Sequence, residues 1–294
     1  MHLIRLSGIA VFALALSSTV GGAEDPGKIN PPPSAILIDH AGLKKLSWQL
    51  LCQSSTFREI SFEGMLDVLH TNGFHHIELS PGQVVSRNSN EYITVGPRIE
   101  PSYLDMLNTM LKEAHLDIVS YSDTGLGHSE ADARKVFEFA KALNVKNIVS
   151  TPSTESLEML DKLATEYAIN VAILNQPGLP PYADSNALLQ AIKERSMRIG
   201  VCADIVEWRR AGQDPVDCVR KLKGRIFEVY LKDSSGQAET AVIADTLKEL
   251  AQQKFKGAFS VQTATGSGPD LIKNLAAVVN SFSDIVTKLA SAAK

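Results

Sequence analysis

Residues 147–174 contain the pattern that decides the fold: Asn147-Ile-Val-Ser150, an amphipathic segment over 155–167, and Asn170-Val-Ala-Ile-Leu174. The two outer runs are apolar, rich in β-branched residues and of strand length, whereas the middle segment has the helical spacing of apolar residues. Ser153 and Thr154 precede that segment and are typical residues for a helix start. The stretch therefore predicts a strand–helix–strand unit whose two strands are parallel.

The same alternation continues toward both ends of the chain. The predicted strands lie at 46–51, 75–79, 116–121, 147–150, 170–174, 198–203, 226–231 and 258–262. The predicted helices lie at 62–69, 101–114, 130–143, 155–167, 186–195 and 215–222, and the last two begin at Glu239 and Pro269. Strict alternation of this kind is typical of a parallel sheet covered by helices.

Two architectures fit a strictly alternating chain: an open doubly wound sheet and a closed barrel. Eight strand–helix pairs in about 250 residues favour the barrel. No Gly-x-Gly-x-x-Gly follows the first strand, so the best sequence signal for a dinucleotide-binding open sheet is missing. We predict an α/β fold with a single (β/α)8 TIM barrel over residues 46–294.

The first 45 residues differ from the rest. A basic start that ends at Arg5, an apolar run over 6–20 and the small residues Gly21-Gly-Ala23 are typical of a secretory signal peptide. We predict a signal peptide at 1–23 and a Pro-rich lead-in at 24–45, in which 34–45 form a short strand or an arm packed on the domain. The protein is then exported, periplasmic or extracellular, and has no membrane segment after cleavage.

Composition excludes several classes of protein. The chain has 294 residues, 44% hydrophobic and 21% charged, which is enough apolar content for a sizeable core. Its 29 Lys and Arg against 33 Asp and Glu give a net charge of −4, so no nucleic-acid partner is predicted. Cys52, Cys202 and Cys218 are too few for a disulfide scaffold or a four-cysteine zinc site, and we expect buried thiols with at most one bridge.

The barrel prediction indicates where functional residues lie, because reactive groups in such barrels sit at the carboxyl ends of the strands. The polar residues predicted there are Gln53, Arg58, Glu78, Gln83, Tyr121, Asp123, Thr151, Asn175, Gln176, Asp204, Glu207, Trp208, Tyr230, Lys232, Asp233 and Gln262. Amides, hydroxyls and aromatic rings in one ring suit a polyhydroxylated ligand, since each hydroxyl group needs both a donor and an acceptor.

Several segments of the chain resemble a known family. They read Gly73-Phe-His-His-Ile-Glu78-Leu-Ser-Pro-Gly-Gln83, Arg134-Lys-Val-Phe-Glu-Phe-Ala-Lys141, Val201-Cys-Ala-Asp204-Ile-Val-Glu-Trp208, Gly212-Gln-Asp214-Pro and Gly224-Arg-Ile-Phe-Glu-Val-Tyr230-Leu-Lys-Asp233. Together they resemble the sugar isomerase/epimerase superfamily with a xylose-isomerase-like barrel, most closely its exported branch common in planctomycete-like bacteria. The resemblance spans most of 46–265. It implies a barrel that acts on sugars by proton transfer next to a carbonyl group, at a divalent metal held by carboxylates and a histidine.

The chain departs from the metal-binding pattern that this resemblance implies. Of four ligand positions only Asp204 keeps a ligand; the others hold Leu174, Tyr230 and Gln262. Glu207 stands where a substrate-contacting His is usual, and Thr151 where a Glu is often found. One carboxylate does not hold a divalent ion against water. We therefore expect no metal site, and the sequence predicts no other cofactor.

Roles follow for the rim residues. The predicted catalytic residues are Glu78, Asp204, Glu207 and Lys232, and the predicted substrate-binding residues are Arg58, Gln83, Tyr121, Asn175, Gln176, Trp208, Tyr230 and Gln262. Structural alternatives stay open for most of them. Glu78 could pair with Arg58, Asp204 and Glu207 could form a loop hydrogen-bond network, Lys232 could pair with Asp233, and Tyr121 and Trp208 could be core residues. His128 is the one histidine retained as a candidate.

Three functions are compared. The first is an exported sugar isomerase, epimerase or lyase-like enzyme that works without the usual metal, with a small carbohydrate as its partner. The second is a catalytically inactive barrel that binds a carbohydrate or a partner protein. The third is a family-2 apurinic endonuclease, which has the same barrel but needs clusters of His and Glu for several zinc ions; the sequence offers neither these nor a basic surface, so we reject it.

Overall fold

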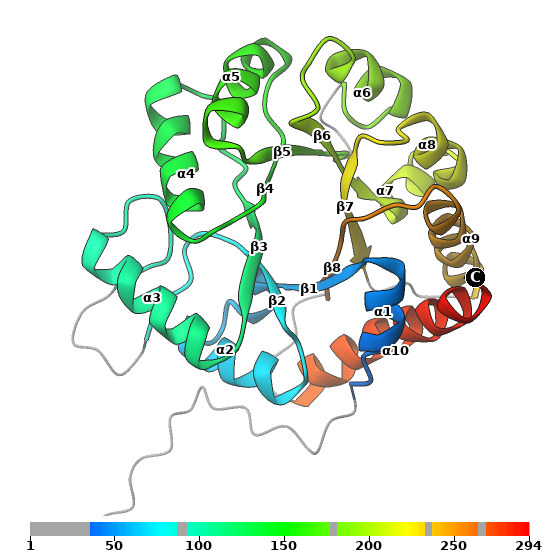
Figure 1. The fold of residues 1–294 in the computed structure, drawn as a ribbon, viewed down its shortest axis with the longest axis horizontal. Helices are drawn as coiled ribbons and strands as arrows, with labels where there is room; N and C mark the ends of the chain where they lie inside the picture. The colour runs from blue at the N-terminus through cyan, green and yellow to red at the C-terminus, as the bar shows by residue number, and fades with distance from the viewer. Residues whose placement is uncertain (1–35, 87–92, 177–180, 233–236, 264–268, 294) are drawn as a thin grey trace, which may run out of the picture.

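A computed structural model of the chain describes residues 36–86, 93–176, 181–232, 237–263 and 269–293 (Figure 1). Within these residues eight strands form a closed parallel barrel in the order β1 to β8. The strands are β1 Gln49–Gln53, β2 His76–Leu79, β3 Asp117–Ser122, β4 Asn147–Ser150, β5 Asn170–Leu174, β6 Ile199–Asp204, β7 Ile226–Lys232 and β8 Ala258–Gln262. The predicted single (β/α)8 barrel is confirmed.

Helices surround the barrel, as Figure 1 shows. They are α1 His40–Leu46, α2 Phe62–Thr71, α3 Pro101–Glu113, α4 Glu130–Ala142, α5 Leu157–Tyr167, α6 Ser185–Ile192, α7 Ile205–Arg210, α8 Pro215–Lys221, α9 Gln237–Gln252 and α10 Pro269–Ala292. Their starts follow local chemistry. Ser129 accepts a hydrogen bond from the Asp132 backbone N–H at 3.1 Å, and Asp184 caps α6 in the same way.

Side chains on the strands alternate between the helix layer and the barrel interior. The residues that face the helices are apolar and belong to the main core; on β2, β7 and β8 they are Ile77, Leu79, Val229, Leu231, Phe259 and Val261. Phe259 shows how dense this layer is, because its ring lies 4.5 Å from that of Trp48 and 5.0 Å from that of Phe282. Burial of this layer against the helices closes the barrel.

Two register shifts interrupt the regular pairing of the strands. One lies between Ile77 and Glu78, where β2 pairs with β3, and the other lies between Val201 and Cys202, where β6 pairs with β7. At each shift one residue of the partner strand is left out of the pairing, which changes the inward or outward direction of the residues that follow. The residues that pair directly after the shifts include the polar residues Glu78, Ser120 and Glu228, whose side chains lie inside the barrel.

The amino-terminal boundary of the packed domain lies earlier than the predicted residue 46. Helix α1 begins after Asp39, whose Oδ1 accepts the Gly42 N–H at 2.8 Å and whose Oδ2 accepts the Thr287 hydroxyl of α10 at 2.6 Å. Ile36 and Leu43 are buried in the core. The second half of the predicted lead-in therefore packs as a helical arm beside α10 (Figure 1), whereas the predicted signal peptide lies outside the described residues.

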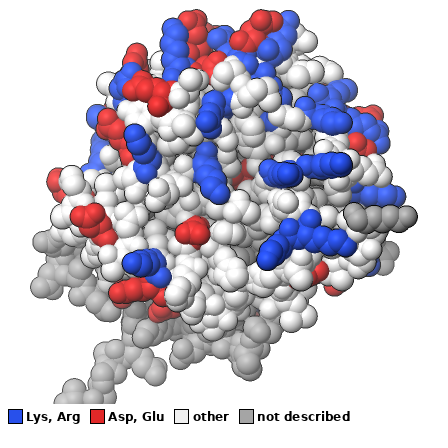
Figure 2. All heavy atoms as spheres, in the orientation of Figure 1, with Lys and Arg blue, Asp and Glu red and all other residues white. Residues whose placement is uncertain are grey.

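Three further observations concern the whole domain. Cys52, Cys202 and Cys218 are all buried and free, as expected for structural thiols. No helix in the described part of the chain has the length and apolar character needed to cross a membrane. The face drawn in Figure 2 carries Lys and Arg side chains interspersed with Asp and Glu side chains.

Candidate functional site

A cavity of about 570 Å³ opens at the carboxyl ends of the strands. Eight of the twelve residues predicted from the sequence line it: Arg58, Asn175, Gln176, Asp204, Glu207, Tyr230, Lys232 and Gln262. Gln53, Ser55, Ser80, Ser122 and Thr124 add further amide and hydroxyl groups. The structure thus brings most of the predicted site together at the end of the barrel where barrel enzymes bind their substrates.

An ion-pair cluster forms one side of this cavity. The Lys232 ammonium lies 2.5 Å from Asp204 Oδ2 and 3.7 Å from Glu207 Oε1. Glu207 also accepts from Arg210 Nη1 at 2.8 Å. Lys232 keeps 29% of its side chain exposed, while Asp204 is 1% exposed, so the cation faces the cavity and its partner lies behind it. Lys232 thus pairs with Asp204, a contact that was not predicted, whereas Asp233, the partner proposed from the sequence, lies outside the described residues.

Asp204 owes its position to the start of helix α7, which the sequence analysis treated as a loop. Its Oδ1 accepts the Glu207 backbone N–H at 3.1 Å, so Asp204 is the N-cap that begins this helix. Burial raises the pKa of Asp204, and the Lys232 charge acts in the opposite direction. The Asp–x–x–Glu spacing therefore gives a helix start in which both carboxylates are held near one ammonium group.

The amides of the cavity differ in how freely they can bind a ligand. Asn175 is bound on both sides, since its Nδ2 donates to the Asp204 carbonyl at 3.0 Å and its Oδ1 accepts the Asp204 N–H at 2.6 Å. This pair of bonds joins the end of β5 to that of β6. Gln262 makes one long contact of 3.5 Å with the Ser55 hydroxyl. Gln262 is therefore better placed than Asn175 to exchange its contact for a ligand.

Glu78 lies below the cavity and is fully buried. Its Oε1 accepts the Tyr230 hydroxyl at 2.5 Å, and its Oε2 accepts the hydroxyl of Ser260. The considered pairing with Arg58 is therefore wrong, because both carboxylate oxygens are already bound and Arg58 donates from Nε to the Ser55 carbonyl at 3.2 Å. Of the two hydroxyl groups that donate to Glu78, that of Tyr230 belongs to a residue that lines the cavity.

A second buried carboxyl group, Glu228, was missed. It is fully buried on β7, and its Oε2 accepts the Ser120 hydroxyl. Burial, together with the charge of Glu78, raises the pKa of Glu228 well above the ordinary value. The signal was present in the sequence: Tyr230 and Lys232 were placed facing the interior, and the period of two in a strand puts Glu228 on the same face.

Three predicted substrate-binding residues do not line the cavity. Gln83 is buried beneath it and donates from Nε2 to the carbonyls of Phe57 and Ile60, both at 3.2 Å, which fixes the loop after β1. Tyr121 points toward the helices, where its ring packs edge-on against Phe139 at 5.1 Å. Trp208 is fully buried in the core under α7. The strand-end positions of these residues gave no information on the direction of their side chains, and for that reason the sequence did not show that they lie away from the cavity.

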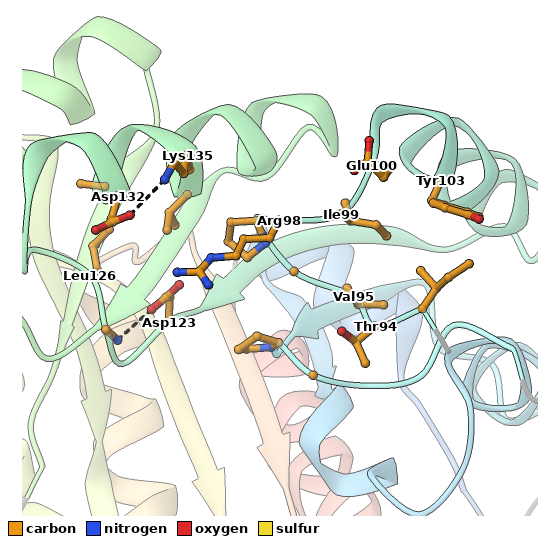
Figure 3. Close-up of a pocket in the computed structure, with 18 of the residues that line it drawn as sticks. Thr94, Val95, Arg98, Ile99, Glu100, Tyr103, Asp123, Leu126, Asp132 and Lys135 are labelled. Carbon is orange, nitrogen blue, oxygen red and sulfur yellow. Dashed lines mark hydrogen bonds and ion pairs between the residues drawn. The ribbon is translucent and has the colours of Figure 1, made fainter. Parts of the chain in front are cut away.

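A neighbouring cavity of about 620 Å³ lies between the segment 93–100 and the first turns of α4. It shares Pro81 with the cavity described above, and it contains His128. Figure 3 shows Arg98 extending between Asp123 and the start of α4, with Lys135 bound to Asp132 at 3.2 Å. Its charged side chains are of both signs and, apart from the half-buried Asp123, they are exposed, so it lacks a fully buried ionic group such as Asp204 of the first cavity.

Comparison with known proteins gives structural relatives only. No protein-family model matches the chain, and no curated protein matches it. Among solved structures, an uncharacterised protein from Parabacteroides distasonis is 23% identical with a TM-score of 0.67, and the match covers 81% of this chain and 99% of that one. A D-psicose 3-epimerase solved in the presence of D-fructose is 12% identical with a TM-score of 0.63, covering 82% and 99%.

A xylose isomerase domain protein from Alicyclobacillus acidocaldarius is 13% identical with a TM-score of 0.58, and the match covers 83% of this chain and 99% of that one. These relatives agree in architecture over nearly their whole length, whereas their sequences have diverged widely. The chain has the TIM-barrel fold of xylose isomerase-like and sugar-epimerase proteins.

Proposed function

We propose that the protein binds a carbohydrate in the cavity at the carboxyl ends of the strands and transfers a proton next to its carbonyl group. The observation that carries this proposal is the Lys232 ammonium, which is held by Asp204 and exposed to a cavity lined with amides and hydroxyls. A cation fixed in this way can stabilise the oxygen on which negative charge develops when a neighbouring C–H proton leaves. Relatives with the same fold include a D-psicose 3-epimerase, which supports a sugar as ligand.

The residues present do not fit the divalent metal that this fold family implies. Leu174 offers no donor atom, and the Tyr230 hydroxyl is engaged with Glu78. Asp204 faces the Lys232 ammonium at 2.5 Å, and that positive charge opposes a second cation at the same carboxylate. Among the described residues, no group of three or more His, Cys, Asp or Glu could hold a metal ion. We propose that Lys232 supplies the positive charge that a metal would provide.

The remaining cavity residues have distinct roles in this proposal. Glu207 lines the cavity beside Lys232 and is the rim carboxylate available to accept a proton. Asp204 is committed to Lys232 and to the start of α7, so it is a positioning residue. Gln176, Gln262 and Arg58 offer donors and acceptors to the sugar hydroxyl groups.

A catalytically inactive barrel that binds a carbohydrate or a partner protein is the second candidate. Asn175 favours it, because an amide bound on both sides by backbone groups has become part of the scaffold. The two candidates differ in one measurable property. An enzyme exchanges a carbon-bound hydrogen of its sugar with solvent, whereas a binding barrel does not.

Binding can be tested by calorimetric titration with D-fructose, D-psicose and D-xylose. We expect one of these sugars to bind and K232M to weaken its binding by about 10-fold, equivalent to about 1.4 kcal/mol. The control variant is K162M, which removes an exposed lysine of α5. Purified protein with one bound divalent ion per chain, and binding that a chelator abolishes, would contradict the proposed role of Lys232.

Export belongs to the same proposal. We propose that the predicted signal peptide at 1–23 directs the protein out of the cytoplasm; burial of Cys52, Cys202 and Cys218 would protect these thiols from oxidation there. Amino-terminal sequencing of the protein secreted by its host would give Glu24 as the first residue. A mature chain that still begins at Met1 would refute export by this route.

A further inference from the structure

The interior of the barrel contains two carboxyl groups where such barrels are usually filled by branched apolar side chains. Glu78 on β2 and Glu228 on β7 are both fully buried. Three hydroxyl groups surround them: Ser260 and Tyr230 donate to Glu78, and Ser120 donates to Glu228. The pair is thus a built hydrogen-bond network and not an accidental approach of two side chains.

The two register shifts of the sheet determine which residues of β3 and β7 lie level with Glu78. Glu78 pairs with Ser120 across the shift between β2 and β3, and Cys202 pairs with Glu228 across the shift between β6 and β7. Without the shifts, Val119 and Phe227 would occupy these register positions. The fold therefore uses an irregularity on each side of the barrel to bring Ser120 and Glu228 to the level of Glu78.

The two carboxyl groups approach each other in the interior. Their side chains cross inside the barrel, because Glu78 of β2 reaches Tyr230 of β7, while Glu228 of β7 reaches Ser120, the register partner of Glu78 on β3. Glu228 Oε1 has no hydrogen-bond partner among the described residues. Two ionised carboxylates this close in a buried site repel each other, so one proton between them halves the buried charge and gives Glu228 Oε1 a hydrogen bond.

The groups around Glu78 and Glu228 supply no positive charge that could neutralise the two carboxylates. Cys202 of β6 and Tyr230 of β7 lie beside the pair, and burial together with the carboxyl charge keeps their pKa values above the ordinary range. Asp204 lies one level higher and pairs with Lys232. Neither carboxyl group makes an ion pair with a Lys, Arg or His among the residues described.

Tyr230 connects this pair with the cavity. Its hydroxyl lies 2.5 Å from Glu78 Oε1, and the same residue lines the cavity two positions before Lys232 on β7. We infer that Glu78 and Glu228 share one proton beneath the cavity, and that Tyr230 passes protons between this pair and the bound sugar. This inference rests on the proposed function, and it names the group that acts at the floor of the cavity while Glu207 lies at the rim.

The transfer balances in atoms and charge. The C–H bond next to the sugar carbonyl breaks, and its electron pair moves onto the carbonyl oxygen beside the Lys232 ammonium. The proton binds the Tyr230 oxygen as the hydroxyl hydrogen of Tyr230 moves to Glu78 Oε1. The pair then holds two protons and no net charge, which favours the step because a buried charge is removed. The reverse movement returns a proton to carbon.

The shared proton can be tested without a ligand by infrared spectroscopy of the full chain near pH 7. We expect the carbonyl stretch of a protonated carboxylic acid, which shifts in D₂O and disappears in E228Q. The control variant, E138Q, changes an exposed carboxylate of α4 and should keep the band. Absence of this band from the unchanged protein, or its presence at full intensity in both E228Q and E78Q, would overturn the shared proton.

The relay is tested with D-psicose or D-fructose in D₂O by following deuterium entry next to the carbonyl. We expect Y230F to lower the exchange rate by about 10²-fold or more with little change in the dissociation constant. The control, Y182F, alters a buried tyrosine outside the cavity. Unchanged exchange in Y230F would overturn the relay, whereas failure of the unchanged protein to exchange any of the sugars that it binds would refute the proposed enzyme as well.

Discussion

The two faces of strands β2, β7 and β8 differ sharply in chemistry, although they share one backbone. Toward the helices the strands present Ile77, Leu79, Val229, Leu231, Phe259 and Val261, whereas toward the interior they present Glu78, Glu228, Tyr230, Lys232, Ser260 and Gln262. The outer face supplies the apolar burial that holds the barrel closed. The inner face must satisfy hydrogen bonds and charge, and it is therefore the face that can carry a binding site.

The largest expected effect is on the outer face. Phe259 is fully buried between Trp48 and Phe282, so F259A removes apolar contacts and leaves a cavity. We expect a loss of about 3–5 kcal/mol in the free energy of unfolding. Urea denaturation followed by circular dichroism measures it, and a loss below about 1 kcal/mol would break the distinction between the faces.

Glu228 provides the second test, through pH. Its raised pKa means that the folded state keeps a proton that the unfolded state loses above the ordinary value of 4.5. Stability of the unchanged protein then falls as pH rises above that value, while the amide of E228Q does not titrate. We expect E228Q to gain about 1.4 kcal/mol relative to the unchanged protein for each pH unit within this window. Parallel stability curves from pH 5 to pH 8 would contradict the protonated interior.

Ser260 gives a smaller effect one residue away from Phe259. S260A removes a hydroxyl that donates to Glu78, while the Tyr230 bond to the same carboxyl group remains. We expect a loss of about 1–2 kcal/mol, in the range for a hydrogen bond to a carboxyl group. Phe259 and Ser260 are neighbours in the chain but point to opposite faces of β8. A comparison of F259A and S260A in the same denaturation experiment therefore measures how much the direction of the side chain matters. Equal losses would mean that the two faces contribute alike.

The smallest expected effect on the free energy of unfolding comes from an exposed ion pair on a helix. Lys162 and Glu158 lie four residues apart on α5, 2.9 Å from each other, with 74% and 66% of their side chains exposed. We expect K162A to change the free energy of unfolding by less than about 0.5 kcal/mol. A larger change would show that exposed ion pairs contribute to the free energy of unfolding on the same scale as residues on the strands.

The outer face was predictable from sequence, and the inner face only in part. Runs such as 147–150 and 170–174 gave the strands directly, because apolar β-branched residues mark them whatever lies inside the barrel. The two register shifts leave no mark in composition, so the sequence did not show that Ser120 and Glu228 would meet Glu78. The sequence did not indicate the contact of Lys232 with Asp204 on the adjacent strand, because only the closed barrel brings these two residues together.

Side-chain direction explains the other errors. Strand β3 continues to Ser122, so Tyr121 is not the last residue of the strand and it faces the helices. Trp208 belongs to α7, a helix whose N-cap, Asp204, was assigned only to the site. Helix capping and catalysis use the same residue types, and the sequence alone did not separate the two uses.

We propose that a fixed lysine, not a metal ion, supplies the positive charge at a site of proton transfer to and from a sugar. Nuclear magnetic resonance in D₂O can decide between the two, with metal-free protein, a chelator and the sugar that binds best. We expect deuterium to enter next to the carbonyl under these conditions, and we expect K232M to abolish this exchange while K162M does not. Exchange that appears only after a divalent ion is added, and that persists in K232M, would contradict the proposal.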